Sequence, residues 1–221
     1  MEVLYIALLL FSTVNANSFP NKEFFHQSLI FNGSFVFENI GKEYVSALKN
    51  LRLKAPNCLD ESLRIVLEDL STRSTIARSS FNLSFPECVN KDVQTLLYHF
   101  DMVDNYVMKY LEATYGEETL LNDDGHLLGL QGLPSKAHVH VYEKSSDASA
   151  PTQESLSFPY HTDNGLYLLL SPSHVSPLMI KHRDGSIHKI NVSDDSIILL
   201  LGTGWLSDTF KKSVTFYSFS H

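Results

Sequence analysis

The sequence has few basic residues, two cysteines and no long apolar run. Lys and Arg number 17 against 25 Asp and Glu, so the formal net charge is −8. Without a cluster of basic side chains the chain lacks the electrostatic footprint of a nucleic-acid-binding protein, and we expect no nucleic-acid partner. Its 43% hydrophobic and 19% charged residues over 221 positions indicate a globular chain with a substantial core and exclude the disordered class.

The apolar run nearest the N-terminus, residues 4–11, is too short to span a bilayer. It precedes Val14-Asn15-Ala16, a small-residue cleavage pattern, and together these features predict a secretory signal peptide over residues 1–16. No membrane span is expected after cleavage. The stretch contains Glu2 and neither Lys nor Arg, so a buried N-terminal strand is the alternative.

The cysteines and three sequons agree with a secreted or ER-lumenal protein. Cys58 and Cys88 are the only cysteines, and an even count in an oxidising compartment favours a disulfide over two reduced, buried thiols. Closing that loop would contribute about 3 kcal/mol in the chain-entropy model. Asn32, Asn82 and Asn191 each begin an Asn-x-Ser sequon and are the predicted glycosylation sites.

We expect the region over residues 17–130 to be mainly helical. Asn57 and Asn90 are predicted N-caps, and the apolar stripe after Asn90 follows the i, i+3, i+4 spacing of a helix that packs on a core. A short strand is predicted over residues 31–37, and helices over residues 42–51, 57–70 and 90–116.

The region over residues 131–221 is predicted to be β. Closely spaced strands with no helices between them indicate a sandwich, barrel or jelly roll rather than a parallel sheet. Asp184-Gly185 suits the tight turn of a hairpin. The strands are expected over residues 137–142, 166–170, 177–182, 186–190, 196–201 and 214–219.

The pattern His-x-Asp occurs three times, at His99, His161 and His182. In the predicted helix, residues two apart point about 200° from each other, which sets the first occurrence aside. The third lies in the predicted hairpin, where Asp184 belongs to the turn. Only His161 and Asp163 would project together from the mouth of an apolar strand. An imidazole and a carboxylate on one face are two of the three ligands of a facial Fe(II) triad.

Other chemistries have less support in the sequence. No Gly-x-Ser-x-Gly elbow indicates a serine hydrolase, and no glycine-rich phosphate loop accompanies His182-Arg183-Asp184 to indicate a kinase. A cupin-like metal site formed by His138, His140 and His161 is an alternative, since His-x-His on a strand is a legitimate ligand pair.

The last ninety residues resemble the isopenicillin-N-synthase-like branch of the 2-oxoglutarate/Fe(II) oxygenases, built on a double-stranded β-helix (jelly roll). His161-Thr162-Asp163-Asn164-Gly165 matches the metal-binding His-x-Asp-x-Gly of the family, and His140-Val141-Tyr142 stands where the family has Asn-x-Tyr. The resemblance implies Fe(II) held by His161 and Asp163, contacts of His140 and Tyr142 with 2-oxoglutarate, and O2 as the oxidant. The fold it implies is α+β, with a helical N-terminal region before the jelly roll.

Two features of the family pattern are not matched. The third iron ligand falls on Phe216 in one register, which cannot bind iron, and on His221 in the other. The Arg that pairs with the distal carboxylate of 2-oxoglutarate, and the last strand that carries it, would come after His221, and no other Arg matches that position. The expectation is therefore either an oxygenase acting on an unknown substrate or a truncated or degenerate, inactive relative that serves as a binding module.

Overall fold

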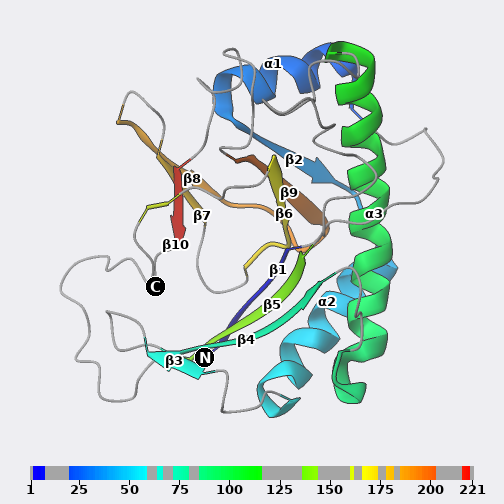
Figure 1. The fold of residues 1–221 in the computed structure, drawn as a ribbon, viewed down its shortest axis with the longest axis vertical. Coiled ribbons are helices and arrows are strands. Elements are labelled where there is room, and N and C mark those ends of the chain that lie inside the picture. The colour runs from blue at the N-terminus through cyan, green and yellow to red at the C-terminus, as the bar shows by residue number, and fades with distance from the viewer. Residues whose placement is uncertain are drawn as a thin grey trace, which may run out of the picture.

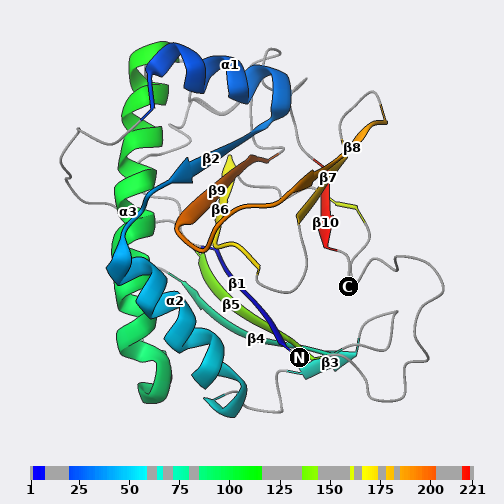
Figure 2. The same cartoon turned by 180° about the vertical axis from the view of Figure 1, so that it is seen from behind.

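The computed structural model describes residues 2–7, 20–58, 64–66, 72–79, 85–115, 136–143, 160–161, 166–173, 178–181, 185–202 and 216–219. In these parts of the chain, helices cover one face of a seven-stranded antiparallel sheet, and a three-stranded antiparallel sheet lies across its other face (Figure 1). Seen from behind, α2 and α3 run along one side of the molecule and β7, β8 and β10 lie on the opposite side (Figure 2). The predicted mixture of helices and antiparallel sheets is confirmed.

The first helix is capped at both ends. The side chain of Asn21 accepts a 2.8 Å hydrogen bond from the Glu23 N–H at the start of α1, and the helix ends at Gly33, whose φ of 64° lies in the left-handed region. Because the helix extends to Asn32, the strand predicted to begin at residue 31 begins at Ser34 instead. The helices are α1 (Lys22–Asn32), α2 (Lys42–Lys54), the short 3-10 helix η1 (Ala55–Cys58) and α3 (Glu87–Tyr115).

The long helix α3 was predicted correctly in its core and wrongly at its start. It begins at Glu87, directly after Pro86, so Asn90 lies inside the helix and its N–H donates to the Pro86 carbonyl. The Pro86 carbonyl accepts the first hydrogen bonds of the helix, from the N–H groups of Val89 and Asn90, so Asn90 is not the N-cap that was expected. The apolar stripe is buried as predicted, through Val93, Leu96, Leu97, Phe100, Val103, Val107, Tyr110 and Leu111.

The seven-stranded sheet has the order β2-β9-β6-β1-β5-β4-β3, and the three-stranded sheet the order β10-β7-β8. The strands predicted after residue 136 are present. The strands are β1 (Glu2–Ala7), β2 (Ser34–Glu38), β3 (Arg64–Val66), β4 (Thr72–Ser79), β5 (Lys136–Glu143), β6 (Tyr167–Leu170), β7 (Leu178–Lys181), β8 (Ile187–Ile190), β9 (Ser196–Leu201) and β10 (Phe216–Phe219).

The helix predicted over residues 57–70 is wrong at its centre, because residues 64–66 form β3. Thr72–Ser79 pairs with β5 over eight residues, and β3 adds to the other edge of β4. The apolar spacing that suggested a helix is overridden by strand pairing, of β3 with β4 and of β4 with the distant β5, as happens to a segment with modest helix propensity.

Strand β1 lies in the middle of the seven-stranded sheet, within the stretch expected to be a signal peptide. It pairs with β5 along its whole length, from Glu2↔Glu143 to Ala7↔His138, and pairs with β6 at Ala7↔Leu170. This fold therefore takes the alternative form in that residues 2–7 are a strand, paired on both sides. The fold does not support the signal peptide, which stays a prediction.

The segment before β9 is fastened to helix α2. The Asp195 carboxylate accepts a 2.6 Å hydrogen bond from the Gly41 N–H at the start of the helix, and the Tyr44 hydroxyl donates to the Ser196 carbonyl at 3.0 Å. Arg52 forms a 2.7 Å ion pair with Asp194. Polar contacts thus fix α2 against the segment that leads into β9.

Two hydrophobic cores lie on opposite faces of the seven-stranded sheet. The helix-side core joins α1, α2 and α3 to residues of the sheet such as Val139, Leu169 and Leu199. The inter-sheet core lies between the two sheets and consists of Tyr142, Leu170, Leu178, Ile180, Ile198 and Leu200. Side chains of β5 and β9 alternate between these two cores, which explains why neither strand has a fully solvent-exposed face.

The predicted disulfide is present between Cys58 of η1 and Cys88 of α3, with Cα atoms 6.3 Å apart. Among the described helices, none combines the length and apolar character that crossing a bilayer requires.

Candidate functional site

The inner face of β5 carries polar side chains in a row. His138, His140 and Tyr142 alternate with buried Val139 and Val141, which face the helix-side core. The ring centroids of His138 and His140 are 5.4 Å apart, and those of His140 and Tyr142 are 6.3 Å apart. His140 and Tyr142, which the resemblance assigned to 2-oxoglutarate, thus lie on one face of β5, toward the space between the sheets.

Strand β4 adds two residues to this face. Its register places Arg73 opposite Tyr142 and Thr75 opposite His140, so each pair shares a side of the sheet. The Thr75 hydroxyl lies 2.9 Å from Nδ1 of His140, and Arg73 hydrogen-bonds to the Tyr142 side chain. We call Arg73, Thr75, His138, His140 and Tyr142 the β4–β5 cluster.

The cluster contains a permanent cation beside a neutral imidazole. Burial lowers the pKa of His140 to about 3, and the charges of Arg73 and His138 lower it further. Burial raises the pKa of the Tyr142 phenol, against the opposing effect of Arg73. At neutral pH, His140 and Tyr142 therefore act as uncharged hydrogen-bonding groups next to a guanidinium.

His161 is half-buried and makes an isolated β-bridge in the segment that leads to β6. The ring of the preceding residue, Tyr160, lies 5.7 Å from Nζ of Lys181 at the end of β7. Phe216 of β10 is the register partner of Lys181, so the described part of β10 begins at this end of the small sheet. Asp163 and His221 lie outside the described residues.

No group of three His, Cys, Asp or Glu side chains among the described residues could hold a metal ion. His138, His140 and His161 are all described, so the cupin-like site that would combine them is not formed. The facial triad is a different matter, since two of its three predicted ligands fall outside the described part of the chain.

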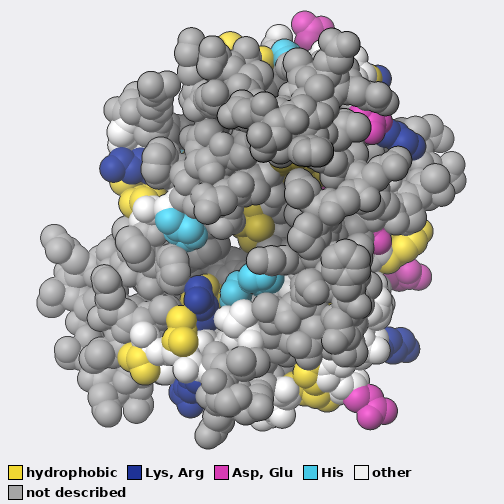
Figure 3. Space-filling view, viewed as in Figure 1, with side chains coloured by type: hydrophobic (Ala, Val, Ile, Leu, Met, Phe, Trp, Pro, Cys, Tyr) yellow, Lys and Arg dark blue, Asp and Glu magenta, His cyan; other side chains and the backbone are white. Residues whose placement is uncertain are grey.

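A hollow opens on the face shown in Figure 3, between the region of β7, β8 and β10 and the region of β1 and β5. Histidine side chains lie on both sides of this hollow, with hydrophobic and basic side chains next to them. The polar face of β5 and the inter-sheet core belong to the same space between the sheets.

A buried contact holds β6 against α3. The Tyr167 hydroxyl donates a hydrogen bond to Oδ1 of Asp104, and both side chains are buried. Burial raises the pKa of Asp104 to about 7, with the nearby Asp101 also raising it and the bond from Tyr167 lowering it. Because β6 follows the His161 segment directly, this contact fixes the strand next to the expected iron ligands.

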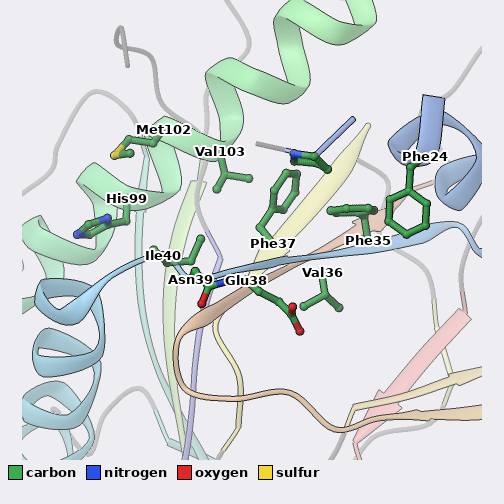
Figure 4. A pocket seen from close by; sticks show the side chains of 11 residues that line it. Phe24, Phe35, Val36, Phe37, Glu38, Asn39, Ile40, His99, Met102 and Val103 are labelled. Atoms are coloured by element: carbon green, nitrogen blue, oxygen red, sulfur yellow. The ribbon is translucent and has the colours of Figure 1, made fainter. Parts of the chain in front are cut away.

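A separate cavity of about 270 Å³ lies on the helix side, bounded by α1, β2 and α3. Phe24, Phe35 and Phe37 stand along one part of it, and His99 and Met102 at the other (Figure 4). Neither ring nitrogen of the buried His99 makes a hydrogen bond. As predicted, His99 lies on a helix, and this cavity is across the sheet from the β4–β5 cluster.

Solved structures with this architecture come from several sources. A full-length Neurospora crassa protein in complex with alpha-KG and 5-formyluracil superposes with a TM-score of 0.60 at 13% identity, covering 90% of this chain and 71% of that one. The rice dioxygenase for auxin oxidation gives 0.56 at 13% identity, with 90% and 72% covered. The Arabidopsis thaliana dioxygenase for auxin oxidation, in a complex with 2-oxoglutarate, gives 0.54 at 14% identity, with 90% and 85% covered.

The chain has the fold of the 2-oxoglutarate/Fe(II) oxygenases. No protein-family model and no curated protein matches the sequence. The resemblance inferred from His161-Thr162-Asp163 and its neighbours is therefore confirmed as a likeness of structure, over 90% of the chain. In this oxygenase fold, the β4–β5 cluster lies on the large sheet and the segment of Tyr160 and His161 passes the end of the small one.

Arg73 and Thr75 were not predicted as site residues. Both lie in a stretch that was expected to follow a helix, and their pairing with β5 joins residues more than sixty positions apart. The one local signal was the run Thr72-Arg73-Ser74-Thr75-Ile76, whose β-branched residues favour a strand.

Proposed function

We propose that this protein is a non-haem Fe(II)/2-oxoglutarate-dependent oxygenase. The observation that supports it most is the inner face of β5, where His140 and Tyr142 stand in the space between two sheets of an oxygenase fold. His161 lies in the segment before β6, directly after Tyr160, whose ring is 5.7 Å from Nζ of Lys181 on β7. Together these features supply a polar, partly enclosed site whose donor types suit iron and a dicarboxylic acid.

His161, Asp163 and His221 would hold the iron, through two imidazoles and one carboxylate. When bound, Fe(II) with 2-oxoglutarate and O2 supplies the oxidation of an unactivated C–H bond. Of the two registers for the third ligand, only His221 offers an imidazole, since Phe216, which pairs with Lys181 at the start of β10, has no metal-binding group. A two-ligand site formed by His161 and Asp163 is the version that follows if His221 takes no part.

The chain's own residues bind and orient the co-substrate and exclude water. His140, fixed at Nδ1 by Thr75, and Tyr142, fixed by Arg73, present hydrogen-bonding groups without needing to reorganise. The apolar side chains of the inter-sheet core close the space behind them. Asp104 and Tyr167 hold β6 in place from the helix side.

The finer features of the fold and the location are part of the proposal. Two antiparallel sheets that pack face to face through the inter-sheet core suit a double-stranded β-helix of the isopenicillin-N-synthase-like branch. An oxidising compartment, either the ER lumen or the extracellular space, suits the disulfide. Asn32 and Asn191 are exposed, as glycan acceptors must be, while Asn82 lies outside the described residues.

Anaerobic titration with Fe(II), followed by absorbance after adding 2-oxoglutarate, tests the ligand set. We expect one iron per chain in the wild type, loss of binding in His161→Ala and Asp163→Ala, and full binding in the control His188→Ala, which alters an exposed histidine of β8. Weaker binding in His221→Ala assigns it as the third ligand. Binding that survives in His161→Ala would contradict the proposed site, and a wild type that binds no iron would favour the inactive relative.

A further inference from the structure

The helix-side cavity between α1, β2 and α3 contains a buried polar group without a partner. His99 of α3 lines the cavity and is 7% exposed, and neither of its ring nitrogens makes a hydrogen bond within the described part of the chain. Leaving a buried polar group unpaired costs about 1–3 kcal/mol, which a ligand that pairs with it would recover. We infer that this cavity binds a small neutral aromatic molecule that has one hydroxyl group, and that the hydroxyl bonds to His99.

One wall of the cavity is built from aromatic rings. Phe35 and Phe37 of β2 are buried, and their ring centroids are 4.9 Å apart in an edge-to-face arrangement. The ring of Phe24, from α1, meets that of Phe35 edge to face at 5.9 Å. Figure 4 shows these three rings in a row, with His99 at the other end of the cavity. Because aromatic rings attract one another in such arrangements, at centroid distances of about 4.5–7 Å, the row favours a planar aromatic ligand.

The size of the cavity fits one aromatic ring with a substituent. Its volume is about 270 Å³. An apolar cavity of about 150 Å³ is already large enough to bind benzene. Three of the lining residues, Phe24, Glu38 and Asn39, are exposed, so the cavity reaches the surface. A ligand can therefore enter from solvent, near the end of β2.

The charges around the cavity favour a neutral ligand. Burial lowers the pKa of His99, against the opposing effects of Glu43 and Asp195, so the ring is uncharged at neutral pH. No Lys or Arg is present among the described residues that line the cavity, and Glu38 at its opening is acidic. A carboxylate would therefore lose its hydration without gaining a counter-ion. A neutral imidazole has one acceptor nitrogen and one N–H donor, and a phenolic hydroxyl can bond to either.

Binding in this cavity does not depend on the proposed oxygenase activity. The aromatic wall and Val103 belong to the helix-side core, whereas Tyr142 of the β4–β5 cluster belongs to the inter-sheet core. The two sites thus lie on opposite faces of the seven-stranded sheet, and the cavity can be tested in the absence of iron and 2-oxoglutarate.

NMR titration of the full chain with phenol and with toluene tests this site. The two probes have the same ring and nearly the same size, but only phenol has a hydroxyl. We expect the wild type to bind both, and the signals of the His99 ring nitrogens to move with phenol and not with toluene. His99→Leu removes the hydrogen-bonding group, so its affinity for phenol should fall by about 5- to 10-fold while its affinity for toluene stays within twofold.

Tyr98→Leu is the matched control, because Tyr98 precedes His99 on α3, is 55% exposed and does not line the cavity. We expect it to bind both probes as the wild type does. Phe24→Ala keeps the test decisive if His99→Leu does not fold, since it removes a ring that is 62% exposed. Loss of this part of the aromatic wall should weaken the binding of both probes by about 3- to 10-fold.

A wild type that binds neither probe would overturn the site, and so would a Phe24→Ala variant that binds both as tightly as the wild type. If the ratio of phenol to toluene affinity is the same in the wild type and in His99→Leu, the hydroxyl does not bond to His99. Ring-nitrogen signals that stay in place with phenol would lead to the same conclusion, and would leave a water molecule as the partner of this histidine.

Discussion

Two carboxyl groups on α3 lie in surroundings that disfavour their charge. Burial raises the pKa values of both Asp101 and Asp104 to about 7. Asp104 is 3% exposed and accepts a hydrogen bond from Tyr167, so its charge state affects the contact between α3 and β6. The pKa of the Asp104 carboxyl is higher in the folded than in the unfolded chain. The stabilisation that the protonated carboxyl contributes is therefore complete below about pH 4 and is lost as the pH rises through about 7.

Asp104→Asn should remove part of that pH dependence. In the wild type, we expect Asp104 to lower the free energy of unfolding by about 2 kcal/mol between pH 5 and pH 8, since the folded carboxyl must release its proton while buried. Urea unfolding at the two pH values measures the difference. The variant should lose less stability over this interval, whereas Glu112→Gln, an exposed change on the same helix, should behave as the wild type. Equal pH dependence in wild type and Asp104→Asn would contradict the argument.

Arg52 joins α2 to the segment that follows β6 and to the turn that precedes β9. Its guanidinium bonds to Asp194 at 2.7 Å and to the Pro172 carbonyl at 2.6 Å, and its side chain is 8% exposed. Arg52→Met should lower the free energy of unfolding by about 2–3 kcal/mol, because Asp194 and a carbonyl lose their partner. Arg64→Met, at an exposed position, serves as the control in urea unfolding. A change below about 0.5 kcal/mol would show that the pair does not stabilise the fold.

At the scale of elements, the sequence predicted what local pattern determines. Strand β9 is an unbroken run of buried residues, and the hairpin of β7 and β8 has Gly185 at a φ of 86°, as the Asp-Gly turn requires. Strand β4 was missed because it is stabilised by pairing with β5, far along the chain, and β3 was missed because it pairs in turn with β4. His161 could be predicted because its motif is local in the sequence. Arg73 could not, because only the register between β4 and β5 places it opposite Tyr142.

The disulfide links η1 to the first turn of α3 and closes a separation of 30 residues that contains β3 and β4. Replacing Cys58 and Cys88 with Ser should lower the free energy of unfolding by about 3 kcal/mol, because the unfolded chain regains the freedom of that loop. Denaturation of the wild type and the double variant, both without reductant, measures the effect. Alkylation of the unfolded wild type provides the control, and two reactive thiols would show that the bond does not form.

At the scale of the whole molecule, residues 1–16 have two incompatible roles. As part of the sheet, β1 must stay in the folded chain, whereas a signal peptide is removed from it. As β1, residues 2–7 fill the position between β5 and β6, and the sheet is continuous from β2 to β3. Removal of these residues would leave β5 and β6 without a shared neighbour and expose unpaired backbone groups in the middle of the sheet.

Comparison of residues 1–221 with residues 17–221, each produced directly, distinguishes these two roles. We expect the shorter chain to unfold at a lower urea concentration, because β5 loses six paired residues. Equal midpoints would mean that β1 contributes nothing to the folded sheet, as a cleaved signal peptide requires. The mass of the secreted protein, measured after expression in a eukaryotic cell, would then identify the cleavage site.

The central claim is that the space between the two sheets supports oxidation driven by 2-oxoglutarate. The most direct measurement is succinate formed from 2-oxoglutarate by the full chain, loaded with Fe(II) without oxygen and then exposed to O2. We predict succinate production in the wild type and in His188→Ala, and its loss in His161→Ala. Succinate at the same rate in His161→Ala, or none from the iron-loaded wild type, would contradict the account.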